Sequence, residues 1–271
     1  MSAKGSTSNT QNGGVSRFSY KANGRAVRFP EEIEPRIWAG RRVLILSPHP
    51  DDDAIACGGT IALLAAAGTR QRVIYMTDGS KGGPGDPQEI AATRSREAEE
   101  SLQVLGVKEW ESLDREDGEL LYDEGALNSL LSAYRSFSPH MVFAPSLVDG
   151  AEDHFATAVL LGNCLATTGS EAEVCSYEVW MAQVPNVLVD IGAVMEKKCD
   201  AIRCHRSQMH IVDFAEKFKG LASYRSLLSL KGARYCEAFH RYSAEEYTLE
   251  AAKAENVTLD RFMQANLNGH D

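Results

Sequence analysis

The sequence has no uninterrupted apolar run of about 18 residues, the length that a membrane-spanning helix needs. Residues 1–14 also lack the apolar core of a secretory signal. These two absences argue against a membrane span. They favour a protein that works in the cytoplasm.

Basic residues are scarce relative to acidic ones. The 271 residues include 28 Lys and Arg against 38 Asp and Glu, which gives a formal net charge of −10 at pH 7. No local run of Lys or Arg offsets this excess, and negative charge repels both nucleic acid and anionic membrane surfaces. We therefore expect a small-molecule partner, neutral or cationic, and no nucleic acid. The sequence leaves the oligomeric state open, with a homo-oligomer as one option.

Closely paired cysteines are also absent. The six cysteines are scattered through the chain without the spacing of a zinc knuckle or of a small disulfide-rich protein. We expect reduced thiols, most of them buried. Disulfides are therefore not expected to stabilise this fold.

The chain divides into a short tail and one domain. Residues 1–25 are rich in Ser, Asn and Gly and have too few large apolar groups to offset the entropy of ordering. We expect a flexible N-terminal tail over 1–25. No Pro-, Gly- or Ser-rich linker interrupts the remainder, so residues 26–271 are expected to form a single domain.

Strand and helix patterns alternate through most of that domain. The apolar run at 43–46 is typical of a strand buried on both faces, and a polar loop separates it from a helical pattern at 60–67. This alternation predicts an α/β fold with a Rossmann-like, mostly parallel sheet, right-handed crossovers and helices on both faces. The C-terminal third is less regular. Further strands are expected at 72–76, 110–113, 141–144, 172–180, 187–191 and 237–239, and further helices at 90–105, 126–137, 154–168, 193–204 and 214–230.

The ligand crevice of such a sheet lies beyond the carboxyl ends of its strands. We therefore expect the ligand-binding residues in the loops after residues 46, 76 and 144. No Gly-x-Gly-x-x-Gly pattern follows the first strand, and acidic residues there would repel phosphate. Both features disfavour a nucleotide-binding protein.

The loop after the first strand carries one imidazole and three carboxylates: His49, Asp51, Asp52 and Asp53. Carboxylates this close repel one another, and a divalent cation relieves that repulsion. The alternative is a solvated acidic turn at a helix N-terminus, where Asp is favourable. His49 shifts the balance toward metal, because imidazole and carboxylate together form a zinc-like ligand pair.

A third ligand must come from another loop at the end of a strand. His154 is the obvious candidate, since it starts a helix beyond the strand at 141–144. His205 is intermediate, because a helix end with His, Ser and Gln could line a polar pocket. The remaining histidines are expected on the surface or in the core: His140, which precedes its strand, and His210, His240 and His270.

These residues resemble the LmbE-like (PIG-L) de-N-acetylase superfamily over roughly residues 40–240. The specific match is Pro48-His49-Pro50-Asp51-Asp52 followed by Gly58-Gly59, with Asp153-His154 after a later strand. The resemblance implies a Rossmann-like sheet that holds a catalytic zinc and hydrolysis of an acetamide on an amino sugar or its conjugate to a free amine and acetate. Weaker matches are Thr77-Asp78-Gly79, Arg94 with Glu97, Leu105-Gly106-Val107, Asp117-Gly118 and His205-x-Ser207-Gln208.

The resemblance also implies roles for individual residues. His49, Asp52 and His154 would bind Zn²⁺, with another divalent transition metal such as Fe²⁺ as the alternative, and Asp51 would act as general base. Three protein ligands leave one position for water, and a neighbouring uncoordinated carboxylate can take its proton.

Four further positions surround this centre. Arg94 and Asp117 would bind sugar hydroxyls; the alternatives are an Arg94–Glu97 pair on a helix surface and a turn role for Asp117 before Gly118. Asp53 and Asp153 would support the ligands without binding metal, Asp53 by orienting His49.

One position departs from the family. The family usually has His-x-Asp-His in the second motif, and its first His helps to stabilise the oxyanion; here that residue is Ala151. His205 is the candidate substitute. The departure keeps a second hypothesis open: a catalytically impaired member that binds metal and an amino-sugar ligand.

Overall fold

The computed structural model describes residues 19–22, 25–120, 123, 125–210 and 212–268. Residues 1–18 of the tail that we expect to be flexible lie outside this part. β1 (Ser19–Ala22) and β2 (Arg25–Arg28) pair antiparallel in a small sheet of their own. Within the described residues, no helix is long and apolar enough to cross a membrane.

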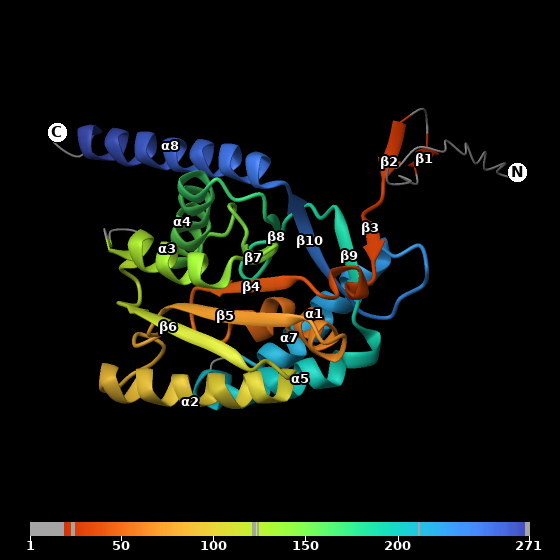
Figure 1. Cartoon of the computed structure of the whole chain (residues 1–271), viewed down its shortest axis with the longest axis horizontal. Helices are drawn as coiled ribbons and strands as arrows, with labels where there is room; N and C mark the ends of the chain where they lie inside the picture. Colours follow the sequence, from red (N-terminus) through yellow and green to blue (C-terminus); the bar gives the residue numbers. More distant parts are fainter. Residues whose placement is uncertain (1–18, 23–24, 121–122, 124, 211, 269–271) are drawn as a thin grey trace, which may run out of the picture.

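The main sheet has eight strands in the order β3-β9-β10-β8-β7-β4-β5-β6 (Figure 1). The strands from β8 to β6 in this order are parallel neighbours, and β10 runs antiparallel to both β8 and β9. The mostly parallel α/β sheet predicted from the sequence is therefore confirmed. The bounds are β3 (Glu31–Ile33), β4 (Arg42–Ser47), β5 (Arg70–Thr77), β6 (Glu109–Arg115), β7 (Met141–Pro145), β8 (Glu173–Tyr177), β9 (Val187–Asp190) and β10 (Cys236–Tyr242).

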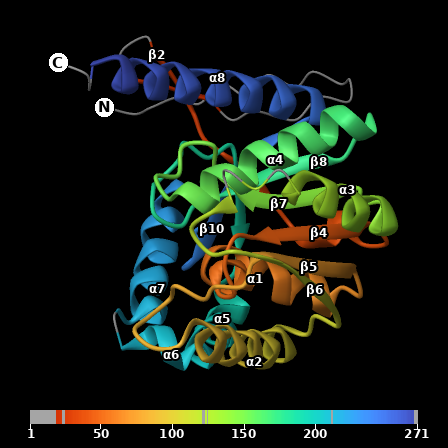
Figure 2. The ribbon, with the colours of Figure 1, turned by 90° about the vertical axis from the view of Figure 1, so that its left-hand side faces the viewer.

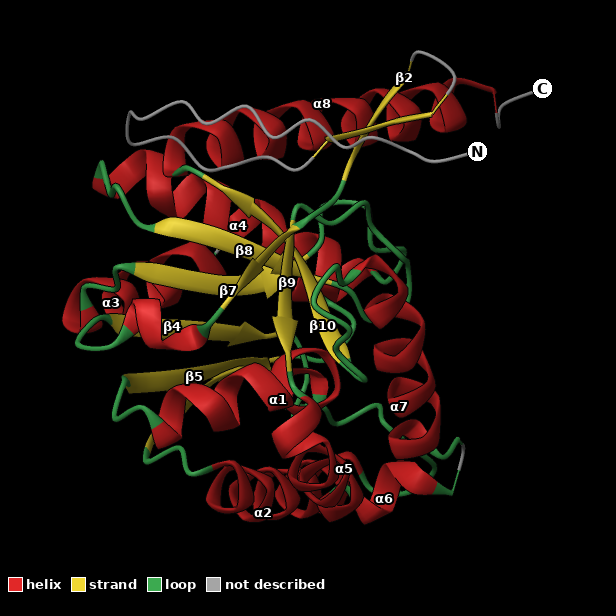
Figure 3. Cartoon of the chain, turned by 90° about the vertical axis from the view of Figure 1, so that its right-hand side faces the viewer, coloured by secondary structure: helices red, strands yellow, loops and turns green. Residues whose placement is uncertain are grey.

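Helices cover both faces of this sheet, as predicted (Figures 2 and 3). Alternate residues of β4 join separate cores: Val43 and Ile45 pack with α1, α2, α5 and α7, whereas Leu44 and Leu46 pack with α3, α4 and α8. Burial on both faces explains the continuous apolar run of this strand. The bounds are α1 (Asp52–Ala66), α2 (Pro87–Leu105), α3 (Ala126–Phe137), α4 (Glu152–Thr168), α5 (Met195–Cys204), α6 (Arg206–Met209), α7 (Phe214–Arg225) and α8 (Ala244–Asn268), with short 3₁₀ turns η1 (Pro35–Trp38), η3 (Gly192–Val194) and η4 (Ser226–Leu228).

The C-terminal third differs from the prediction, which did not include the short helix α6. The helix expected over 214–230 ends at Arg225, and η4 follows it. Helix α8 was not predicted, although Ser243 and Glu246 form a capping box at its start, with Ser243 N donating to Glu246 Oε2 over 2.9 Å. α8 packs on α4, where a Cβ added to Gly162 would lie 2.4 Å from the Cβ of Ala251.

Helix α1 is broken at Cys57, whose φ of −130° and ψ of 18° are not helical. The carboxylate of Glu237, from β10, caps the second half of the helix: it accepts hydrogen bonds from Gly59 N at 2.8 Å and Thr60 N at 2.7 Å. Lys198 Nζ lies 2.6 Å from the same carboxylate, and both side chains are buried. The pair fixes the short first part of α1, which begins at Asp52.

We predict that Glu237→Gln lowers the free energy of unfolding by about 3 kcal/mol, because Lys198 then keeps a buried charge without its partner. Urea denaturation of the variant measures this. Glu250→Gln is the matched control, since it removes an exposed pair with Lys253 and should cost under about 1 kcal/mol. An equal effect of the two substitutions would contradict the role given to the Lys198–Glu237 pair.

Candidate functional site

The site lies where the carboxyl ends of β4 and β7 meet. These strands are parallel neighbours in the sheet, so the loops that follow them emerge at the same edge. The first loop carries His49 and leads into Asp52 at the start of α1. The second leads into α4, whose first turn carries His154. The sheet thereby brings together residues that lie about 100 positions apart in the sequence.

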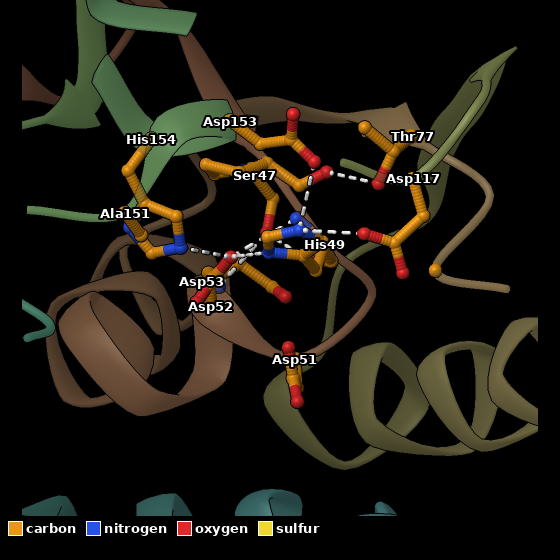
Figure 4. A network of polar contacts seen from close by, with 12 residues as sticks. Ser47, His49, Asp51, Asp52, Asp53, Thr77, Asp117, Ala151, Asp153 and His154 are labelled. Carbon is orange, nitrogen blue, oxygen red and sulfur yellow. Dashed lines mark hydrogen bonds and ion pairs between the residues drawn. The ribbon is translucent and has the colours of Figure 1, made fainter. Parts of the chain in front are cut away.

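His49, Asp52 and His154 converge on one point (Figure 4). Asp52 Oδ2 lies 3.2 Å from His49 Nδ1 and 3.2 Å from His154 Nε2. One ligand atom from each residue lies within 4.8 Å of the others. The His154 ring is fully buried, and neither ring nitrogen makes a well-aligned hydrogen bond in the described structure. Two imidazoles and a carboxylate in this arrangement fit a divalent transition metal.

The far side of the His49 ring is held by two other carboxylates. His49 Nε2 lies 3.1 Å from Asp153 Oδ2 and 3.3 Å from Asp117 Oδ1. Asp153 is itself fixed by the amide of Gly118 at 2.7 Å, and Asp117 by the amide of Lys81 at 2.8 Å. A carboxylate on one ring nitrogen orients a histidine and leaves the other nitrogen free to bind metal. Asp117 therefore contacts His49 and is more than a turn residue.

The electrostatics of this cluster favour a positive charge at its centre. Burial acts to raise the pKa of Asp52, but the adjacent His154 and His49 rings outweigh it and hold that pKa well below its ordinary value. Burial acts to lower the pKa of both imidazoles, but the surrounding carboxylates have the larger combined effect. The pKa of His49 is raised, and that of His154 rises to about 9. A divalent cation bound between these side chains would meet the same negative charge.

Asp53 does not orient His49, contrary to our expectation. Its carboxylate is buried and makes no hydrogen bond within the described structure. Burial, followed by the nearby charges of Asp51 and Asp52, raises the pKa of Asp53 to about 7.

Asp51 lies apart from the dashed contacts of the cluster (Figure 4). Its Oδ1 is 3.1 Å from the Arg94 Nη2 atom, and Arg94 Nη1 donates to Gly79 O over 3.0 Å. Arg94 is buried, and Gly82 leaves room for it, since a Cβ at Gly82 would lie 2.4 Å from Arg94 Nη1. The guanidinium thus fixes the Asp51 carboxylate beside the candidate metal ligands.

The alternative for Arg94, an exposed pair with Glu97, is wrong. Glu97 is buried and accepts hydrogen bonds from Ser207 N at 2.9 Å and Ser207 Oγ at 2.6 Å. Gln208 Nε2 donates to Gly82 O over 3.0 Å. These bonds anchor α6 against α2 and the loop after β5.

His205 is the C-cap of α5 and directly precedes α6, which carries Ser207 and Gln208. Its ring is buried, and neither nitrogen has a hydrogen-bond partner among the described residues. Burial, opposed by the charge of Asp51, lowers its pKa. A buried imidazole without a partner is costly and points to a ligand. Among the other histidines, His140 Nδ1 accepts from Arg42 N at the opposite sheet edge, and His270 lies outside the described residues.

Sequence reasoning missed Asp149. This buried carboxylate lies 3.4 Å from His154 Nδ1 through its Oδ2, and its Oδ1 accepts a hydrogen bond from Ala151 N over 3.2 Å. It contacts His154 on the side away from Asp52. Its position in a loop at the end of a strand could have identified it, but the following Gly150 also fits an ordinary Asp-Gly turn.

The family described as PIG-L, GlcNAc-PI de-N-acetylase, matches residues 44–165. The diacetylchitobiose deacetylase of Thermococcus kodakarensis is 31% identical over 219 residues, which cover 73% of this chain and 81% of that protein. The chain belongs to the PIG-L (LmbE-like) deacetylase family. The matched segment contains His49, Asp52 and His154.

Solved structures agree with this assignment. The N,N′-diacetylchitobiose deacetylase of Pyrococcus horikoshii, complexed with its inhibitor MPG, has a TM-score of 0.69 and 32% identity over 76% of this chain and 85% of that chain. The 4-carboxy-2-hydroxymuconate hydratase of Pseudomonas putida has a TM-score of 0.67 over 74% of this chain and 95% of that chain. Its identity of 24% shows a shared fold alone.

We predict that the purified chain binds about one divalent transition metal ion, and that Asp52→Ala abolishes this binding because it removes the carboxylate between the two imidazoles. Elemental analysis after dialysis measures the metal content. Asp51→Asn is the matched control and should keep the metal, since Asp51 lies outside the ligand cluster. Equal metal loss in both variants would show that the cluster is wrongly assigned.

Proposed function

We propose that this chain hydrolyses the acetamide of an N-acetylated amino sugar or its conjugate, and releases acetate and a free amine. His49, Asp52 and His154 hold the metal, Zn²⁺ in the first instance with Fe²⁺ as the alternative. The proposal is supported by family membership and by the deacetylases among the relatives. One observation carries it furthest: a carboxylate, Asp51, stands beside the ligand cluster and is held by Arg94 rather than by the ligands.

The metal would supply Lewis-acid chemistry: when bound, it polarises the acetamide carbonyl and lowers the pKa of water. The protein side chains carry the proton transfers and hold the ligands in position. Asp51 takes a proton from the attacking water as the water oxygen bonds to the carbonyl carbon. It then passes this proton to the nitrogen as the C–N bond breaks, so that a neutral amine and acetate are released. Arg94 keeps Asp51 in place during both transfers. Asp117 and Asp153 hold His49 in its ligating orientation, which makes Asp117 a positioning residue in addition to a candidate sugar contact.

The oxyanion that forms on the acetamide also needs a donor. Ala151, the N-cap of α4, offers no side-chain hydrogen bond there. His205 is buried and has no hydrogen-bond partner within the part of the chain that the structure describes, and the charge of Asp51 acts on its pKa, so we infer that it is the substitute donor. Ala151 also supports the second candidate function: a catalytically impaired member that binds metal and an amino-sugar ligand.

We predict that Asp51→Asn lowers acetate release from N,N′-diacetylchitobiose by about 10²- to 10⁴-fold while the metal content stays unchanged, because general base catalysis is lost. Acetate is followed by a coupled assay or by NMR. Asp114→Asn is the control: Asp114 is exposed, and Asn tolerates its φ of 50°. Undiminished turnover in the Asp51 variant would rule out its role as base.

We predict that His205→Ala lowers kcat by about 10²-fold or more without loss of metal, because the oxyanion loses its donor. Ala151→His should then add little, whereas it should raise kcat by about 10-fold or more if Ala151 is a true vacancy. Steady-state kinetics of both variants separate the two accounts. No loss from the first substitution and no gain from the second would favour the impaired binding protein.

A further inference from the structure

An exposed apolar patch lies beside the candidate site. It consists of Val148, from the loop after β7, and Trp180 and Met181, from the loop after β8. Their exposed fractions are 61%, 61% and 51%. β7 and β8 are parallel neighbours, so both loops emerge at the same sheet edge as His154. Exposed large apolar groups that gather at one place mark a binding surface more often than chance exposure does.

The backbone of the patch is linked to the candidate metal centre through Asp149. Trp180 N donates to Asp149 Oδ2 over 3.3 Å, and the same oxygen lies 3.4 Å from His154 Nδ1. Met181 lies over the loop before α4, because a Cβ added to Gly150 would meet its Cγ at 3.7 Å. These contacts place the backbone of the patch on the loops next to His154.

The loop that carries Trp180 is rigidly mounted. The carboxylate of Glu178 forms a buried pair with Arg225 of α7, in which Arg225 Nε lies 2.7 Å from Glu178 Oε1. Gln183 closes the other end of the loop through Ser176 Oγ at 2.7 Å. The indole itself contacts Phe214 edge-on, with ring centroids 6.2 Å apart. Its exposure is therefore built into the fold and does not result from a loose loop.

The charges at this edge favour an uncharged occupant. Arg94, Lys81 and Arg115 each pair with a carboxylate, at 3.1, 3.3 and 3.4 Å respectively. An acidic group would meet the carboxylates of the site without a free cation from these three side chains. A neutral sugar ring presents axial C–H groups on one face, and such a face packs on an exposed indole.

We propose that Val148, Trp180 and Met181 form a subsite for a second, neutral sugar ring attached to the N-acetylated sugar that reacts. The inference rests on the proposed function and deepens it, because it names a neutral oligosaccharide as substrate class in preference to a conjugate with an acidic aglycone. Trp180 is the specificity-determining residue.

The test compares N-acetylglucosamine, N,N′-diacetylchitobiose and N-acetylglucosaminyl malate as substrates of the metal-loaded enzyme. Trp180→Ala should lower kcat/KM for the disaccharide by up to about 10-fold and leave the monosaccharide within about 2-fold, since an aromatic contact of this kind contributes about one order of magnitude at most. Trp180→Phe should restore most of the loss. Tyr224→Ala is the control, because Tyr224 is equally exposed, at 63%, but lies on α7.

A binding measurement separates this inference from the proposed function. The chain has three tryptophans, of which Trp38 is buried and Trp180 is exposed. The Asp51→Asn variant is used because it should leave the disaccharide unhydrolysed. The disaccharide should reduce the quenching of tryptophan fluorescence by acrylamide in this variant. It should not do so in the double variant Asp51→Asn with Trp180→Ala. Protection without acetate release from any substrate would sustain the subsite and refute the proposed reaction.

Three outcomes would overturn the subsite. The first is acetate release from the disaccharide that is unaffected by Trp180→Ala. The second is a clear preference for the malate conjugate. The third is a change in sedimentation on Trp180→Ala without any change in substrate preference, which would make the patch an interface between copies of this chain.

Discussion

The contact between Asp52 and two imidazoles is the interaction on which the rest of this site depends. Asp52 Oδ2 lies 3.2 Å from both His49 Nδ1 and His154 Nε2, in a place where several other carboxylates are also buried. Such a concentration of negative charge is unfavourable unless positive charge meets it. These carboxylates raise the pKa of both imidazoles, which favours positive charge at this point. A divalent cation held by His49, Asp52 and His154 would meet the same negative charge.

The fold supplies this arrangement through distant parts of the chain. Parallel pairing of β4 with β7 places the two ligand-bearing loops together. The buried Lys198–Glu237 pair supports the break in α1, where Glu237 accepts hydrogen bonds from Gly59 N and Thr60 N. The amide of Gly118 holds Asp153. The site is therefore supported on rigid elements, which precise ligand geometry requires. The same fold serves a hydratase, so the reaction follows from these side chains and not from the sheet.

Much of this could be predicted from the sequence, because the relevant signals are local. Apolar runs bounded by Gly and polar loops predicted the parallel strands and the helices on both faces, and the position of His49 and His154 after two such strands predicted that they meet. Long-range partners left no local signal: Glu237 caps a helix 177 residues earlier in the chain. Helix α8 was missed because its buried face is marked by only a few residues, among them Tyr247 and Ala251.

The departures at the site have the same origin. Asp53 resembles its neighbours in the sequence, but its buried carboxylate makes no hydrogen bond within the described structure. Arg94 fits an exposed helical ion pair by spacing alone, whereas the tertiary fold buries it against Asp51. Asp149 was hidden by an Asp-Gly pair that fits a turn equally well. In each case residue type and spacing could not show which groups the folded chain places around the side chain.

X-ray absorption spectroscopy of the zinc-loaded protein tests the central claim most directly. The account predicts two imidazole ligands at about 2.0–2.1 Å, oxygen ligands at about 2.0–2.2 Å and no sulfur. His154→Ala should remove one imidazole from the spectrum. A sulfur ligand at about 2.3 Å, or a spectrum unchanged in that variant, would contradict a metal centre built on His49, Asp52 and His154.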